Sequence, residues 1–442
     1  MNVDLPIVAL VGKPNVGKSS LFNRIVGRRQ AIVEDRPGTT RDRSYETVNW
    51  GGKDFLLVDT AGLNTRGLDE LAEAAEDQAK AALAEADLLL VVVDVLVGIT
   101  DRDEAVAAVV RRGEKPALLL VNKCDTVARK QQAPDFYRLG LGEPYAVSAQ
   151  HGLGVADLLD AAASRLPETE MAAPDPSAPP RLAIVGRPNV GKSSLLNRLA
   201  GEERALVSEI AGTTRDTVDT TIEVDGREVM LVDTAGLRRR GRVIPGVERY
   251  AVLRALSSVR RADVCLLMLD ATEGATDQDA HIGGYVVDNY RGLVILANKW
   301  ELVEGDEYAE RIAEESMKYR FGFVGHVPVL RISALAGTNV GRIVPAGLKV
   351  ADAMKFTITT GRLNQFLNRW IGRRPPPSRG GRPAQFRYAT QTGTRPPTFT
   401  LFFSDPRRIQ KNFVRYIESG FREEFGLQGS PVRLVIRGSR GE

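Results

Sequence analysis

The amino-acid sequence predicts two doubly wound α/β domains, a proline-rich linker between them, and a small α+β module after the second domain. Residues 3–166 and 181–345 both alternate short apolar runs with segments of helical character. Runs such as Leu88–Val93 and Val264–Leu269 are apolar throughout, which is typical of parallel strands covered on both faces. After about residue 345 the order becomes α-β-β-α-β. We therefore expect domains at 1–166, 181–350 and 351–442, with the linker at 167–180.

The apolar runs and turn residues place the elements of the first domain. Strands are expected at Ile7–Val11, Ser44–Trp50, Phe55–Val58, Leu88–Val93, Ala117–Val121 and Tyr145–Val147. Helices are expected at Ser19–Val26, Leu71–Ala84, Asp101–Arg112 and Val155–Leu166. The linker holds five prolines and no periodic apolar face, so we expect an extended spacer.

The second domain repeats the first, and the third segment differs from both. Strands of the second domain are expected at Leu182–Val185, Thr217–Val224, Val229–Val232, Val264–Leu269, Leu293–Ala297 and Val329–Ile332. In the third segment we expect helices at Thr360–Trp370 and Pro406–Ser419 and strands at Gln385–Gln391, Thr398–Phe403 and Pro431–Ile436. Its aromatic residues are expected to form mostly core, because a small domain depends on them for buried area.

The charge is unevenly distributed along the chain. The net charge is +4 overall, but residues 346–442 hold 18 Lys and Arg against 6 Asp and Glu, a net charge of +12. This asymmetry predicts a polyanionic partner for the basic end. No apolar run reaches the roughly 20 residues of a membrane span, and the N-terminus lacks a basic leader. We therefore expect a cytoplasmic protein without a membrane partner, whose thiols Cys124 and Cys265 are buried and reduced.

A glycine-rich string with the pattern G-x-x-x-x-G-K-S occurs twice, each time between a predicted strand and a predicted helix. Its glycines let successive backbone N–H groups turn inward as an anion nest, and the helix that follows adds its positive end. The lysine would lie at the β- and γ-phosphates of a nucleotide, and the serine would bind Mg²⁺. The alternative is a glycine-rich turn without a ligand. The two copies are Gly12-Lys13-Pro14-Asn15-Val16-Gly17-Lys18-Ser19 and Gly186-Arg187-Pro188-Asn189-Val190-Gly191-Lys192-Ser193.

Two further strings repeat in the same order, 174 residues apart. The string G-T-T-R-D, with Thr40 and Thr214, suits a switch that senses Mg²⁺ and the terminal phosphate, or else a polar turn. The string D-T-A-G-L follows a predicted strand, and its carboxylate can hold a Mg²⁺-bound water while its glycine N–H bonds the γ-phosphate. Its copies are Asp59-Thr60-Ala61-Gly62-Leu63 and Asp233-Thr234-Ala235-Gly236-Leu237. The expected Mg²⁺ ligands are Ser19, Thr40, Asp59, Ser193, Thr214 and Asp233, and the expected catalytic residues are Lys18, Thr40, Gly62, Lys192, Thr214 and Gly236.

A base-reading string ends a buried strand in each domain. Asn122-Lys123-Cys124-Asp125 supplies a carboxylate that accepts from the N1–H and 2-amino groups of guanine, which adenine lacks. The second copy is Asn298-Lys299-Trp300-Glu301, so its acceptor lies one methylene further out, which puts guanine recognition there in question. Backbone N–H groups of a following Ser-Ala pair are expected to contact the guanine carbonyl. These pairs are Ser148-Ala149 and Ser333-Ala334.

Five motifs in one order, present twice, resemble those of translation-factor-type GTPases. The whole chain resembles the Der (EngA) family, which has tandem GTPase domains and a KH-like C-terminal domain. The resemblance implies GTP and GDP as ligands, Mg²⁺ as cofactor, and a role in ribosome biogenesis as a monomer that associates with the large subunit and its rRNA, not with DNA.

The glycine of each D-T-A-G-L string is followed by a leucine, Leu63 or Leu237. Other GTPases have a glutamine in this region that positions the attacking water. The resemblance implies a class of GTPases stimulated by K⁺, in which the phosphate-loop asparagines Asn15 and Asn189 hold the ion. A turn-capping role is the alternative for both asparagines.

Two other functions fit parts of the pattern. One is a metabolic or signalling NTPase without an RNA partner, which the basic C-terminal segment disfavours. The other is a second domain that binds nucleotide statically, which the glutamate at position 301 allows. A KH module clamps RNA with a G-x-x-G loop between helices. Here Gly426-Leu427-Gln428-Gly429 matches the string but precedes the last strand, so the module is expected to use another face or to dock on a GTPase domain.

Overall fold

The computed structural model describes residues 5–27, 45–60, 73–167, 178–202, 219–232, 251–376 and 384–438. These residues form two compact units, one with residues 5–167 and 251–257, the other with 178–232 and 258–438. Two expected features lie wholly or largely outside the described residues: both G-T-T-R-D strings and most of the linker.

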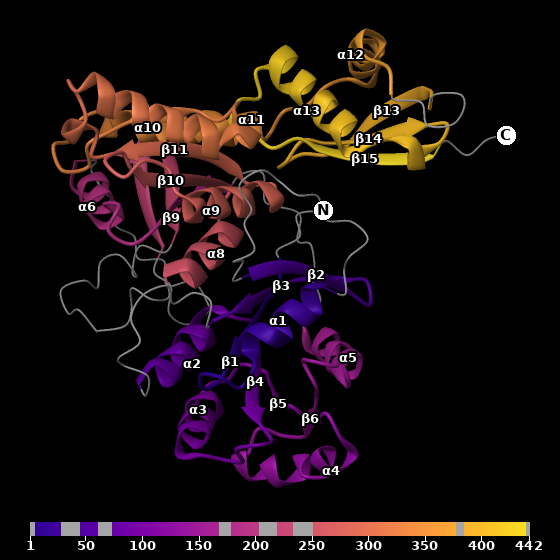
Figure 1. Ribbon diagram of the computed structural model, residues 1–442. Coiled ribbons are helices and arrows are strands. Elements are labelled where there is room, and N and C mark those ends of the chain that lie inside the picture. The colour runs from indigo at the N-terminus through magenta and orange to yellow at the C-terminus, as the bar shows by residue number, and fades with distance from the viewer. Residues whose placement is uncertain are drawn as a thin grey trace. The chain divides into compact units, whose positions relative to one another are not determined.

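The first unit is built on a six-stranded sheet in the order β2-β3-β1-β4-β5-β6 (Figure 1). Only β2 is antiparallel to its neighbour. The strands are β1 (Ile7–Val11), β2 (Tyr45–Trp50), β3 (Lys53–Asp59), β4 (Leu88–Asp94), β5 (Ala117–Asn122) and β6 (Pro144–Ala146). The helices are α1 (Lys18–Gly27), α2 (Glu73–Glu85), α3 (Asp101–Arg112), α4 (Val127–Lys130), the 3₁₀ helix η1 (Ala133–Leu139) and α5 (Val155–Arg165).

The second sheet repeats this topology in the order β12-β11-β10-β7-β9-β8. Its strands are β7 (Arg181–Val185), β8 (Thr220–Val224), β9 (Arg227–Val232), β10 (Val264–Asp270), β11 (Gly292–Asn298) and β12 (Val329–Arg331). Its helices are α6 (Lys192–Glu202), α8 (Ala251–Arg261), α9 (Asp277–Asp288), α10 (Glu307–Arg320) and α11 (Ile343–Ala353), with the 3₁₀ helices η4 (Trp300–Leu302), η5 (Gly322–Val324) and η6 (Val340–Arg342).

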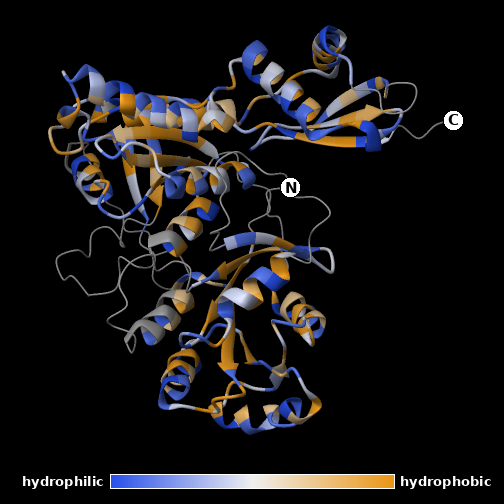
Figure 2. Cartoon of the chain, viewed as in Figure 1, coloured by the Kyte–Doolittle hydropathy of each residue, from blue (hydrophilic) through white to orange (hydrophobic). Residues whose placement is uncertain are grey.

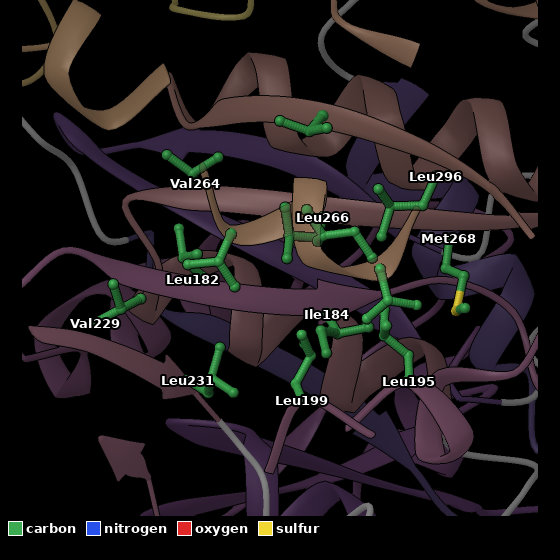
Figure 3. Packing of buried hydrophobic residues seen from close by; sticks show 14 of the residues in the cluster. Leu182, Ile184, Leu195, Leu199, Val229, Leu231, Val264, Leu266, Met268 and Leu296 are labelled. Atoms are coloured by element: carbon green, nitrogen blue, oxygen red, sulfur yellow. The ribbon is translucent and has the colours of Figure 1, made fainter. Parts of the chain in front are cut away.

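Both sheets are apolar on both faces, as the continuous hydrophobic runs predict. All seven residues of β4, β10 and β11 are buried. Figure 2 shows apolar strands beneath helices whose polar residues face outward. Figure 3 shows part of the second core, where Leu182 and Ile184 of β7 lie among Leu266 and Met268 of β10 and Leu195 of α6. The predicted doubly wound fold is confirmed.

The C-terminal module has the expected α-β-β-α-β order. It contains α12 (Thr360–Arg373), β13 (Phe386–Gly393), β14 (Thr398–Phe403), the 3₁₀ helix η7 (Pro406–Arg408), α13 (Lys411–Phe425) and β15 (Arg433–Gly438). Strand β14 pairs with β13 antiparallel and with β15 parallel, and Figure 1 shows α12 and α13 on the same side of these strands. The core is rich in aromatic residues, as predicted. At its centre, Gly420 of α13 packs so closely on Trp370 of α12 that a Cβ would lie 2.3 Å from the indole.

The module and the second sheet belong to one unit and share backbone hydrogen bonds. Leu293, at the start of β11, donates its N–H to the Gly429 carbonyl at 3.0 Å. Gly429 donates in turn to the His326 carbonyl at 3.2 Å. The guanidinium of Arg433 lies 5.2 Å from the ring centroid of Tyr290. We call these contacts the joint; they lie at the amino ends of the strands, the opposite end from the nucleotide motifs.

Candidate nucleotide-binding sites

The two phosphate loops adopt the same backbone conformation at the carboxyl ends of β1 and β7. Gly12 and Gly186 both have φ of 145°, and Gly17 and Gly191 have φ of 96° and 104°. A Cβ on Gly12 would lie 2.3 Å from the Val92 carbonyl oxygen. All four positions favour glycine because φ is positive, and Gly12 and Gly186 also lie too close to the backbone of the neighbouring strand for a Cβ.

The lysine of each loop points toward the loop's own carbonyl groups. The Lys18 ammonium donates to the carbonyls of Gly12 at 2.6 Å and Lys13 at 2.8 Å. Burial of Lys18, which is 4% exposed, lowers its pKa to about 8 against a smaller raising by Asp59. Lys192 repeats the contacts with the carbonyls of Gly186, at 2.9 Å, and Arg187. A buried cation facing an inward-turned loop fits a phosphate ligand.

Two groups fit a Mg²⁺ ion beside that phosphate. The Ser193 hydroxyl oxygen is buried and has no hydrogen-bond partner among the described residues. In the first domain, Asp59 is buried at the end of β3, and the hydroxyl of the next residue, Thr60, donates to the Leu10 carbonyl at 2.6 Å. A serine hydroxyl and a carboxylate are ligands that suit Mg²⁺. The other predicted serine ligand, Ser19, is exposed in α1. The following predicted residues lie outside the described residues: Thr40, Ala61, Gly62, Leu63, Thr214, Asp233, Thr234, Ala235, Gly236 and Leu237.

The second residue of each phosphate loop is anchored to the helix that follows the neighbouring strand, α3 after β4 and α9 after β10, which the sequence analysis did not predict. Lys13 makes an ion pair with Asp103 of α3 at 2.7 Å, and the two side chains are 11% and 1% exposed. Arg187 donates from Nε to both carboxylate oxygens of Asp279 of α9 at 3.0 Å. Each aspartate also closes a capping box at its helix N-terminus. The repeated string G-x-T-D-x-D, at 98–103 and 274–279, is the pattern that could have revealed these anchors.

Asn122 and Asn298 connect each base-reading loop to its phosphate loop. The Asn122 amide donates to the Val16 carbonyl at 2.8 Å and accepts from the Ala149 N–H at 3.0 Å. Asn298 makes the equivalent bonds to Val190 and Ala334, both at 2.8 Å. The predicted Ser-Ala pairs therefore lie beside the predicted Asn-Lys strings in both domains.

The lysines of these strings are held by carboxylates at the ends of the neighbouring strands. Lys123 pairs with Asp94 of β4 at 2.5 Å, and Lys299 pairs with Asp270 of β10 at 2.5 Å. Both lysines have a left-handed backbone, with φ of 67° and 61°. The pKa of Asp270 is lowered because hydrogen bonds from Lys299 and Thr272 outweigh the effect of burial.

The two base-reading acceptors have different surroundings. One oxygen of Asp125 accepts from the Ser148 hydroxyl at 2.6 Å, and the other pairs with Arg129 at 2.9 Å. Glu301 is exposed in η4 and makes no hydrogen bond or ion pair with any described residue. The first carboxylate is therefore fixed in direction, whereas the second is not.

A second unpredicted pair, Arg24 and Arg198, supports the Ser-Ala loops from α1 and α6. Arg24 donates from Nε to the Ala149 carbonyl at 2.8 Å, and Arg198 donates likewise to Ala334 at 3.1 Å. Each arginine also donates to the next carbonyl along the loop. The repeated Asn-Arg string after each phosphate loop, at 23–24 and 197–198, marks these residues in the sequence.

Known families match both repeats and the C-terminal module. The family described as 50S ribosome-binding GTPase matches residues 7–123 and 181–299. The family described as KH-domain-like of EngA bacterial GTPase enzymes, C-terminal, matches residues 357–437. GTPase Der of Caldanaerobacter subterraneus subsp. tengcongensis is 46% identical over 437 residues, which cover 99% of both chains. GTPase Der of Thermomicrobium roseum is 47% identical and covers 98% of this chain and 96% of that relative.

The chain belongs to the GTPase Der family. The predicted resemblance is confirmed. A member of this family is a GTP-hydrolysing enzyme with two GTPase domains that bind GTP or GDP with Mg²⁺, and the phosphate-loop geometry described above fits those ligands. Within the described part of the chain, no helix has the length and apolar character needed to span a membrane.

Proposed function

We propose that this chain is a cytoplasmic factor that assists assembly of the large ribosomal subunit, using GTP at two sites to control its binding to rRNA. The observation that carries the proposal is the joint, which attaches a module from the most basic part of the chain to a nucleotide-binding sheet by backbone hydrogen bonds. The family description, 50S ribosome-binding GTPase, supports the same assignment. We propose the domain limits 1–166, 181–350 and 351–442 for it, acting as a monomer.

In this proposal each phosphate loop cradles the nucleotide with its backbone N–H groups. Mg²⁺ held at this site would neutralise charge on the β- and γ-phosphates. Each ammonium group, on Lys18 and Lys192, now donates to carbonyls of its own loop. When nucleotide binds, the two ammonium groups would donate to the phosphates instead. The assigned Mg²⁺ ligands are Ser19, Thr40 and Asp59 in the first site and Ser193, Thr214 and Asp233 in the second, with Gly62 and Gly236 at the γ-phosphate.

Guanine selectivity of the first site is assigned to Asp125. Because Ser148 and Arg129 fix both of its oxygens, the carboxylate is preorganised to accept from the base. Adenine would leave a desolvated acceptor unpaired, which costs about 1–3 kcal/mol per bond.

We further propose that K⁺ replaces the missing water-positioning glutamine in catalysis. Asn15 and Asn189 have left-handed φ of 64° and 63° and exposed side chains on the phosphate loops, so their amide oxygens are accessible to an ion beside the nucleotide. GTP turnover should be faster in KCl than in NaCl at equal ionic strength. Equal rates in the two salts would contradict the K⁺ assignment.

The ribosomal role is tested by sucrose-gradient co-sedimentation of the full chain with ribosomal particles in GTP, in GDP and in a non-hydrolysable GTP analogue. We expect association with large-subunit particles in the analogue and release in GDP. Association that does not depend on the nucleotide, or none at all, would contradict the proposal. Lys18→Ala and Lys192→Ala variants show which site controls association.

A second candidate concerns the second domain alone, and the exposed, unrestrained Glu301 favours it. In this alternative the second site holds nucleotide statically and only the first hydrolyses GTP. Turnover measured separately in the Lys18→Ala and Lys192→Ala variants discriminates the two, because a static second site predicts no turnover in Lys18→Ala.

A further inference from the structure

The three-stranded sheet of the C-terminal module has one face covered by α12 and α13 and another that no helix covers among the described residues of the module. Side chains alternate between the faces, so the strand register defines the uncovered one. We call it the outer sheet face. It consists of Tyr388, Thr390 and Thr392 of β13, Thr398, Thr400 and Phe402 of β14, and Arg433, Val435 and Arg437 of β15.

The distal end of this face carries two stacked aromatic rings. The rings of Tyr388 and Phe402 lie 4.4 Å apart between centroids at an interplanar angle of 14°. Tyr388 is 48% exposed, whereas the aromatic rings of the module's core are nearly all buried. Thr398 and Thr400, on the middle strand β14, are only 7% exposed. The open part is therefore the end with the rings, where a flat π surface is available to a planar ligand.

The outer sheet face carries positive charge and no acidic residue, which favours an anionic ligand. Arg437 is exposed and pairs in register with Phe402, which places a cation beside the rings. None of the nine residues of the face is acidic. Exposed aromatic rings beside arginine and hydroxyl groups are the chemistry that binds single-stranded nucleic acid, through base stacking and phosphate contacts.

The G-x-x-G string at residues 426–429 is the other candidate RNA contact of this module, but part of it already packs within the protein. Leu427 is 2% exposed, and Gly429 forms the joint through both its N–H and its carbonyl. A Cβ on Gly429 would lie 2.7 Å from Val350 and 2.9 Å from the Leu293 carbonyl oxygen, so no nucleotide backbone fits between them. The expectation that this string does not clamp RNA is consistent with its position in the joint.

We propose that the outer sheet face binds a short single-stranded segment of RNA, with bases stacked on Tyr388 and Phe402 and a phosphate paired with Arg437. This proposal rests on the proposed ribosomal function and locates the RNA contact. The open end presents the two rings of Tyr388 and Phe402, on which bases of a short segment can stack. Arg433 closes the proximal end, because its guanidinium already lies over Tyr290 of the joint.

The test measures fluorescence anisotropy of a labelled, mixed-sequence, eight-nucleotide RNA titrated with the full chain. We expect Tyr388→Ala to weaken binding about tenfold and Tyr388→Phe to retain it, since stacking needs the ring and not the hydroxyl. Arg437→Gln should reduce the slope of log K against log salt by about 0.7, the loss of one phosphate contact. Far-UV circular dichroism and GTP turnover, both expected to be unchanged, check that the variants fold.

Tyr319→Ala is the matched control, because Tyr319 is a more exposed tyrosine of the same unit, 75% exposed, with a guanidinium 5.3 Å from its ring. It should leave RNA binding unchanged. Equal affinities of Tyr388→Ala and Tyr319→Ala would overturn the proposal. If Tyr388→Ala then still reduced co-sedimentation with particles, the face would be a protein contact instead.

The two proposals fail separately. If the full chain co-sediments with particles but Tyr388→Ala leaves the oligonucleotide affinity unchanged, RNA binding by the outer sheet face is refuted and the ribosomal function stands. If oligonucleotide binding requires Tyr388 but no particle co-sediments, the face is supported and the ribosomal assignment is refuted.

Discussion

Asp103→Ala would leave the Lys13 ammonium in the first phosphate loop without its carboxylate partner. The pair is buried, with side chains 11% and 1% exposed, and the same carboxylate accepts from the Thr100 N–H at 3.0 Å. Removing one member of a buried ion pair costs about 3–5 kcal/mol. We expect the lower half of this range, because Lys13 keeps a bond to the Thr100 hydroxyl at 3.0 Å.

The three tryptophans allow each sheet to be followed separately, because Trp50 lies in β2, Trp300 in η4 and Trp370 in α12. Fluorine NMR of 5-fluorotryptophan-labelled protein can therefore report urea unfolding of the first unit through Trp50. With a slope of about 2 kcal/mol per M urea, the Trp50 midpoint should fall by about 1.5–2 M. The Trp300 and Trp370 midpoints should not change.

Asp101→Ala is the control on the same helix, since Asp101 is exposed in the first turn of α3 and only its interaction with the helix dipole is lost. The double replacement Lys13→Met with Asp103→Leu removes both charges and should recover most of the stability. If Asp103→Ala lowered the Trp50 midpoint no more than Asp101→Ala does, the anchor would not stabilise the loop and the reasoning would be wrong.

Three further predictions follow from the geometry. Gly17→Ala should abolish GTP binding at the first site, measured calorimetrically, because its Cβ would lie 2.3 Å from the Asn122 amide nitrogen; near-normal affinity would contradict this. Glu301→Asp should tighten GDP binding at the second site about fivefold, as expected if one hydrogen bond of about 1 kcal/mol is restored, and an unchanged constant would exclude a role for that methylene. Burial, with a smaller effect of Arg422, lowers the pKa of His326 to about 3, so the unfolded chain binds a proton below pH 6.5 that the folded joint does not. The free energy of unfolding of the second unit should therefore fall by about 1 kcal/mol between pH 6.5 and 5.5. Urea titrations of His326→Gln should show no such dependence on pH.

The strands and the nucleotide motifs could be predicted because each depends on local pattern. Buried parallel strands read as continuous apolar runs, and most observed bounds fall within a residue or two of those expected. Contacts between distant segments could not be predicted in this way. The Lys13–Asp103 pair joins residues 90 positions apart, and neither residue has a local pattern that names its partner. Only comparison of the two repeats, which carry the same pair twice, would have revealed it.

The role of Gly429 in the joint also could not be predicted from the sequence, because it depends on tertiary contacts. Its string reads as an RNA clamp, whereas its surroundings in the fold make it part of the joint with β11. The exposure of the Tyr388 ring could not be predicted either, because most aromatic residues of the module belong to its core. The sequence also does not indicate which face of the sheet lacks a helix.

Strand β11 has the base-reading Asn298 at one end and the joint at the other. At about 3.3 Å per residue, these ends lie roughly 20 Å apart, and a strand hydrogen-bonded on both sides can neither stretch nor slide. The strand thus fixes the distance between the base-reading string of the second domain and the joint. A ligand bound to the module beside the joint would therefore lie at a set distance from Asn298.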